Sequence, residues 1–101
     1  MDHQMINDLQ IYPIDIGKFN WYVANKLCQE IGDGWRLPTD IELNLIYENR
    51  DTIAGISDGD YWSSISGILE TRARGQYFAN GDKFVSSKSL ECWTRPVRFL
   101  Q

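Results

Sequence analysis

The sequence predicts an α+β fold, with two helices in the first half and a small twisted antiparallel sheet in the second. Three observations support this prediction. Apolar residues recur at helical spacing twice before residue 50, strand-like patterns begin after residue 60, and Asn80-Gly81 separates two of them as a hairpin turn does. With 101 residues and no repeat or linker, the chain forms a single domain, which we place at residues 9–101.

The N-terminal segment is polar, and we expect residues 1–8 to be disordered or frayed. The one histidine of the chain, His3, lies there. A short strand is expected at Ile11, Tyr12 and Ile14. Because Pro13 interrupts this strand, it suits the edge of a sheet, and it can pair with the C-terminal strand and so close the fold.

The first helix is predicted to start after Asn20, a residue type that caps helix N-termini. Gly32 and Gly34 are expected to end it. Between them one apolar stripe follows the helical period, made of Trp21, Ala24, Leu27, Cys28 and Ile31.

Residues 34–43 combine the end of one element with the start of a second helix. Pro38 fixes its own φ and pushes Leu37 toward extended backbone. Thr39 and Glu42 have the spacing of a capping box, which predicts a helix over residues 40–49. We expect Ile41 and Leu45 to face inward, with Leu43 and Tyr47 as further candidates.

The second half of the chain is predicted to be β-rich. Residues 51–60 form a polar loop with Gly and Asp, and strands are expected over 61–64, 71–79, 83–87 and 92–99.

Composition and charge exclude several classes of function. A net charge of −4 argues against general affinity for nucleic acid, although residues 61–101 carry six basic residues against three acidic ones. No apolar run is long enough to insert into a membrane. The one histidine, His3, lies in the segment expected to be frayed, which excludes most general acid–base and Ser-His mechanisms. We therefore expect no enzyme activity. Two cysteines are too few for a structural zinc site, and we expect neither cofactor nor metal.

Five motifs occur in order between residues 19 and 99. They are Trp21-x-x-Ala24-x-x-x-Cys28, GWRLPT-x-x-EL from Gly34, Tyr61-Trp62-Ser63-Ser64, Phe78-Ala79-Asn80-Gly81 and Arg95-Pro96-Val97-Arg98. Together they resemble a bacterial family of domains of unknown function, typified by the C-terminal domain of the Legionella collagen-like adhesin. The resemblance implies a C-type-lectin-like fold, a role in adhesion or ligand binding, and a secreted or cell-surface location. The chain starts without a signal peptide, so the alternative is a cytoplasmic location.

Most motif residues are interpreted as scaffold. Arg36, for example, is expected to bond backbone carbonyls or a carboxylate, because a buried unpaired guanidinium is very costly. The structural signature comprises Trp21, Trp35, Arg36, Pro38, Thr39, Glu42, Trp62, Arg95 and Arg98.

The two cysteines leave two alternatives open. The resemblance implies a disulfide between Cys28 in the first helix and Cys92 in the last strand. Relatives that carry a cysteine near the last motif tend to have it two residues before the first Arg, whereas Cys92 is three residues before Arg95. A shift of one residue reverses the direction of a strand side chain, so a pair of buried thiols is the other alternative.

Candidate ligand-binding residues lie in the basic C-terminal part. In a strand over 71–79, side chains at alternate positions share one face, namely Arg72, Arg74, Gln76 and Phe78. Such a face could bind an acidic glycan or an acidic protein patch, and the alternative is a solvated outer face. Trp93 is a further candidate, although a core Trp is equally compatible.

These observations favour a non-catalytic module that binds a glycan or protein surface through its loop and hairpin side. Calcium is not expected, because Asp58-Gly59-Asp60 and Asn80-Gly81-Asp82 are first of all turn sequences. The alternative is a structural or assembly domain, such as a phage or surface-appendage tip, that acts through protein–protein contacts and forms a homo-oligomer.

Overall fold

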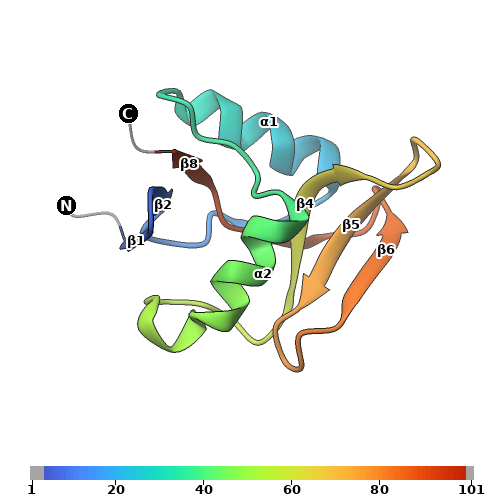
Figure 1. Ribbon diagram of the computed structural model, residues 1–101. Helices are drawn as coiled ribbons and strands as arrows, with labels where there is room; N and C mark the ends of the chain where they lie inside the picture. Colours follow the sequence, from blue (N-terminus) through green and yellow to red (C-terminus); the bar gives the residue numbers. More distant parts are fainter. Residues whose placement is uncertain (1–3, 100–101) are drawn as a thin grey trace.

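In the computed structural model, which describes residues 4–99, two helices pack against two β-sheets (Figure 1). The helices are α1 (Trp21–Ile31) and α2 (Asp40–Glu48), and the 3₁₀ turn η1 (Arg50–Thr52) follows α2. The strands are β1 (Gln4–Ile6), β2 (Leu9–Ile11), β3 (Gly17–Phe19), β4 (Asp60–Ser66), β5 (Arg72–Tyr77), β6 (Lys83–Ser87), β7 (Cys92–Thr94) and β8 (Val97–Phe99). The α+β prediction is therefore confirmed.

The two sheets have three and five strands. The smaller sheet has the order β1-β2-β8 and is antiparallel, so the N- and C-terminal strands close the fold as expected. The larger sheet has the order β3-β7-β4-β5-β6. An antiparallel sheet was predicted, but this sheet is mixed. Strand β7 pairs with β4 in parallel, with Tyr61 opposite Trp93.

The predicted C-terminal strand over 92–99 is two strands rather than one. The segment Arg95-Pro96 lies between β7 and β8 and carries the chain from the larger sheet to the smaller one. Proline has no backbone N–H for a strand ladder, which is consistent with a break at this point.

The N-terminus is more ordered than the sequence predicted. Residues 4–6 form β1, in which Ile6 pairs with Leu9, and the Gln4 side chain accepts a hydrogen bond of 3.1 Å from Ala54 N. The prediction of a frayed segment is thus wrong over residues 4–8, and His3 lies outside the described residues. Of the strand predicted at Ile11, Tyr12 and Ile14, only Ile11 belongs to β2.

Both helices start at their predicted caps. The Asn20 side chain accepts from Val23 N at 3.0 Å, and Thr39 and Glu42 form the reciprocal capping box. The inner side of α2 differs in part from the prediction. Leu43, one of the candidates, is buried, but the equally buried Ile46 was not predicted, and Ile41 is 79% exposed. Ile41 lies two positions before Leu43, which on a helix turns its side chain away from the core.

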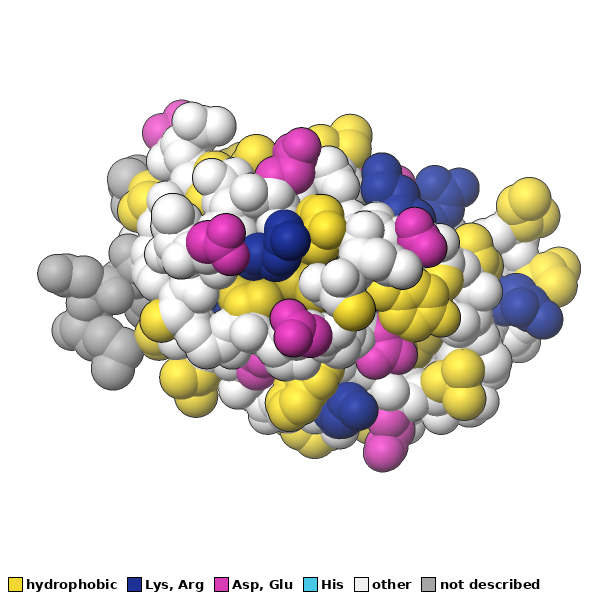
Figure 2. Space-filling model, turned by 90° about the horizontal axis from the view of Figure 1, so that it is seen from below, with side chains coloured by type: hydrophobic (Ala, Val, Ile, Leu, Met, Phe, Trp, Pro, Cys, Tyr) yellow, Lys and Arg dark blue, Asp and Glu magenta, His cyan; other side chains and the backbone are white. Residues whose placement is uncertain are grey.

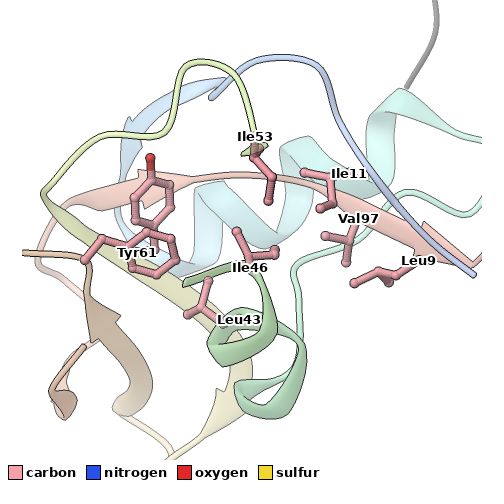
Figure 3. Packing of buried hydrophobic residues seen from close by; sticks show 8 residues of the cluster. Leu9, Ile11, Leu43, Ile46, Ile53, Tyr61 and Val97 are labelled. Carbon is pink, nitrogen blue, oxygen red and sulfur yellow. The ribbon is translucent and has the colours of Figure 1, made fainter. Parts of the chain in front are cut away.

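Two hydrophobic clusters lie on opposite sides of β4. Tyr61 belongs to the cluster under α2, and the next residue, Trp62, belongs to the cluster under α1, because successive strand residues point to opposite faces. Figure 3 shows how side chains from α2, the strands and the loop before β4 converge in the first cluster. It consists of Leu9, Ile11, Leu43, Ile46, Ile53, Tyr61, Phe78 and Val97. The second consists of Ala24, Cys28, Leu37, Trp62, Ala73 and Cys92.

Candidate functional site

The side of β5 that was predicted to bind ligand lies partly under α2. Gln76 and Phe78 are each only 1% exposed. Gln76 Nε2 donates to Asn44 Oδ1 and to Gly81 O, both at 2.9 Å, and the Phe78 ring lies 4.4 Å from the ring of Tyr61. The assignment of Gln76 and Phe78 as ligand contacts is therefore wrong, because α2 covers this end of the strand.

The other end of the same side is open. Arg72 and Arg74 are exposed, and Arg74 Nη1 lies 3.3 Å from Asp40 Oδ2 at the start of α2. Within residues 4–99, Arg72 forms no ion pair. Of the four residues proposed for the face, the structure thus leaves the two arginines accessible.

These arginines border a groove along β5 and β6. A cavity of about 210 Å³ lies between the start of α2 and β6, and a cavity of about 390 Å³ lies beside the β4–β5 loop. Arg74 and Val85 line both cavities, so the two lie side by side. We call this surface the β6 groove, and its lining consists of Asp40, Gly67, Ile68, Leu69, Arg72, Arg74, Gly75, Lys83, Phe84 and Val85.

The β6 groove exposes aliphatic as well as basic side chains. Ile68 is fully exposed, Leu69 is 60% exposed and Val85 is 49% exposed. In Figure 2, which keeps the left–right direction of Figure 1, hydrophobic and basic side chains lie together at the right-hand end, where β5, β6 and the β4–β5 loop are found. Sequence reasoning identified the arginines but missed the loop residues, whose sole signal was an apolar Ile-Leu pair between Gly67 and Glu70.

Trp93 does not belong to this groove. It lies in β7, and β4 separates it from β5. Its ring is partly buried against the α2-side cluster, with Lys18 Nζ 5.6 Å from the ring centroid. The structure therefore does not bring Trp93 together with Arg72 and Arg74.

The signature arginines are held by the scaffold. Arg36 makes a bidentate ion pair with Glu42, with N–O distances of 2.6 and 2.9 Å. Burial alone would raise the pKa of Glu42, but the bonds from Arg36 and from the Thr39 backbone hold it below its usual value. Glu42 thereby links the N-terminus of α2 to Arg36, in the segment between the two helices.

Arg95 is fully buried and ties three segments together. Its guanidinium donates to Tyr12 O at 2.7 Å, Ala54 O at 2.7 Å and Asp15 Oδ1 at 2.9 Å. Arg98 donates to Gln10 Oε1 at 2.6 Å, and its guanidinium lies 4.5 Å from the Trp35 ring centroid. These contacts occupy both arginines of the last motif with the protein's own groups.

The signature tryptophans and Pro38 are also parts of the scaffold. Trp21 Nε1 donates to Ser63 O at 2.8 Å, Trp62 Nε1 donates to Phe19 O at 2.9 Å, and Trp35 is buried. Pro38 O accepts from Ser64 N, which ties the segment before α2 to β4.

A buried lysine that the sequence did not indicate completes the scaffold near α1. Lys88 is 5% exposed, its Nζ donates to Ser66 Oγ at 3.0 Å, and it lies 4.1 Å from the Trp21 ring centroid. In the sequence it sits in a polar run after a strand, which is typical of an exposed turn.

Both cysteines are free, buried thiols in the α1-side cluster. The disulfide alternative for Cys28 and Cys92 is therefore not formed in this structure. Burial raises the pKa of each thiol to about 12, and for Cys92 the Asp60 carboxylate, 3.7 Å from the sulfur, adds to the effect.

The turn sequences considered as cation loops are occupied by local hydrogen bonds. Asn80 Oδ1 accepts from Asp82 N at 2.9 Å, and Ser57 Oγ accepts from Gly59 N at 2.8 Å. Within residues 4–99 no cluster of three or more His, Cys, Asp or Glu side chains could hold a metal ion. None of the helices in this range is both long and apolar enough to cross a bilayer.

No protein-family model and no curated protein sequence matches the chain. Among solved structures, the crystal structure of botrocetin, a snake protein, matches with a TM-score of 0.70 at 11% identity, covering 97% of this chain and 96% of that one. Botrocetin in complex with a mutant von Willebrand factor A1 domain matches with a TM-score of 0.63 at 10% identity and the same coverage. The fold is C-type-lectin-like.

The C-type-lectin-like fold is thus confirmed for nearly the whole chain. At these identities the likeness concerns the fold alone. It does not extend to the bacterial family that the five motifs resemble, which stays a prediction.

Proposed function

We propose that this chain is a non-catalytic binding module whose β6 groove recognises a protein surface. The observation that carries the proposal is the exposure of Ile68, Leu69 and Val85 in the same groove as Arg72. Protein interfaces combine apolar contact area with arginine, and a monomer seldom exposes such a cluster without a binding role.

The fold comparison supports a protein partner. One of the matched structures contains botrocetin bound to a von Willebrand factor A1 domain, so a domain of this architecture is capable of binding a protein. The resemblance of the motifs to bacterial adhesin domains points to the same class of function, and with it to a secreted or cell-surface location rather than a cytoplasmic one.

The chemistry of the groove favours a protein over a glycan and offers no reaction. Aliphatic side chains make up much of its exposed lining, whereas a sugar needs polar groups for its hydroxyls. The single carboxylate of the lining, Asp40, is paired with Arg74, and no nucleophile–base pair lies in the groove.

A second candidate function is assembly. A separate cavity of about 410 Å³ lies between the β1–β2 turn and α2, and Ile41 and Phe99, which are 79% and 59% exposed, line it. Two copies of the chain could bury these residues against each other, as a structural or appendage domain would require.

A parallel screen tests the proposed function. The protein is exposed to a displayed library of random peptides and to an array of neutral and sulfated glycans. We expect peptide ligands whose binding is lost in Leu69→Ser and kept in Ile14→Ser, because Ile14 is 59% exposed, close to the 60% of Leu69, but lies outside the groove. Binding to sulfated glycans alone, unchanged by Leu69→Ser, would overturn the proposal.

A further inference from the structure

The edge of the larger sheet offers unpaired backbone groups beside the β6 groove. β6 is the last strand in the order β3-β7-β4-β5-β6, and among the described residues only β5 pairs with it. An edge strand of this kind is a template for one more strand.

The hydrogen-bond pattern shows which backbone groups point outward. Tyr77 N donates to Asp82 O and Lys88 N donates to Thr71 O, so these are hydrogen-bonded pairs of the antiparallel ladder. Hydrogen-bonded and non-hydrogen-bonded pairs alternate along an antiparallel ladder. The backbone N–H and C=O groups of Phe84 and Ser86, which lie between these two pairs, therefore point toward β5. The N–H and C=O groups of Lys83 and Val85 therefore point away from the sheet.

The side chains of these same residues belong to the groove. In the register of the hairpin, Lys83 lies opposite Gln76, Val85 opposite Arg74, and Ser87 opposite Arg72. Residues opposite each other place their side chains on the same face, so Lys83 and Val85 stand on the side that carries the arginines. A strand added to β6 would bring its alternate side chains into line with this groove.

We infer that the β6 edge binds an extended acidic segment of a partner protein, which adds to the sheet as a sixth strand. This inference rests on the proposed function and names the partner's chemistry. A carboxylate opposite Lys83 and another near Arg72 would meet cations that form no ion pair within residues 4–99. An aliphatic side chain between the two carboxylates would contact Val85 and Leu69.

Charge disfavours a second copy of the chain as the added strand. Pairing β6 with β6 of another copy would bring together two faces that each carry Arg72 and Lys83, which form no ion pair within residues 4–99, and these like charges would repel each other. The chain as a whole carries a net charge of −4, so the basic groove is a local feature.

The geometry also provides a variant that removes one outward donor. Because the Val85 N–H is not used in the ladder with β5, Val85→Pro deletes it without breaking that ladder. Val85→Thr is the matched control, since it keeps the N–H and the branched shape. A preserved melting temperature establishes that both variants fold.

The probe is an acetylated and amidated peptide, Thr-Glu-Thr-Val-Thr-Glu-Thr, and its control carries Lys in place of both Glu. We expect the acidic peptide to bind, to slow hydrogen exchange of the Lys83 and Val85 amides, and to lose about fivefold or more in affinity in Val85→Pro but not in Val85→Thr. The Lys peptide should bind more weakly, by up to about fivefold for each mismatched charge pair.

The outcomes separate this inference from the proposed function. Peptide ligands that lose binding in Leu69→Ser but bind Val85→Pro normally would overturn strand addition and leave the groove as a protein-binding site. Protection of the Val85 amide without peptide, together with a concentration-dependent mass, would show that a second copy occupies the edge and would overturn the acidic partner. If neither the acidic peptide nor any library peptide binds, both proposals fail.

Discussion

Arg95 Nη1 lies 2.9 Å from Asp15 Oδ1, and the exposed fractions of the two side chains are 0% and 9%. Asp15 also accepts a hydrogen bond of 2.6 Å from Tyr61 Oη. The pair joins the segment after β2 to the link between β7 and β8, and it lies in the part of the molecule that carries no proposed ligand contact.

Removal of one partner from this pair is expected to be severe. Asp15→Ala leaves the buried Arg95 guanidinium without a counter-charge, which should lower the free energy of unfolding by about 3–5 kcal/mol. Urea denaturation measures this loss. The control is Arg74→Ala, because the Arg74–Asp40 pair is exposed and should contribute no more than about 1 kcal/mol. Equal losses in the two variants would contradict the assignment of Arg95 to the scaffold.

Glu42 gives the fold a pH dependence whose sign follows from its lowered pKa. The folded-state pKa lies below the ordinary value of 4.5, so the stabilisation is present above that pH and is lost as the pH falls through the folded-state value. We expect Glu42→Gln to be less stable than the original protein at neutral pH, with the gap closing in acid. A gap in unfolding free energy that stays constant from neutral to acidic pH would refute this.

The two cysteines should be unreactive until the protein unfolds. With the pKa of each thiol raised to about 12 by burial, almost no thiolate exists at neutral pH. Ellman's reagent should therefore react slowly with the native protein and rapidly with both thiols in urea. Stability should also fall as the pH rises above the ordinary thiol value of 9.0 toward the raised one. No free thiol in urea without reductant would establish the Cys28–Cys92 disulfide instead.

Substitution of Gln76 tests whether α2 covers this end of β5. Its amide donates to Asn44 Oδ1 and Gly81 O. In Gln76→Glu a carboxylate oxygen, which cannot donate, faces these two acceptors, so the free energy of unfolding should fall by about 1–3 kcal/mol. Arg72→Gln, on the same face but exposed, should change the unfolding free energy by no more than about 0.5 kcal/mol. Thermal or urea unfolding of both variants checks this, and a Gln76→Glu variant as stable as Arg72→Gln would show that α2 does not close over this end of β5.

Local signals in the sequence were sufficient for the helix starts and the hairpin. The caps at Asn20 and Thr39 and the turn at Asn80-Gly81 each depend on residues within a few positions of one another, so no knowledge of the rest of the chain was needed.

The features that the sequence did not predict depend on contacts between distant segments. Gln76 is buried because α2 places Asn44 beside it, and alternation along β5 contains no such information. Strand β7 lies parallel to β4 because the chain returns across the sheet, and Lys88 is buried because Trp21 of α1 lies over it. The arginines of the groove were predicted, because they follow the alternation of a strand. Ile68 and Leu69 were not predicted, because they lie in a loop.

If the β6 groove binds an acidic protein segment, an exchange of charge between groove and ligand should reverse the preference for the ligand. The affinities of the original protein and of the double variant Arg72→Glu, Lys83→Glu are measured for the acidic peptide and its Lys counterpart by NMR titration. We expect the original protein to prefer the acidic peptide and the double variant to prefer the Lys peptide, with each mismatched charge pair costing up to about fivefold in affinity. The same preference in both proteins would show that the basic residues of the β6 groove do not select an acidic segment.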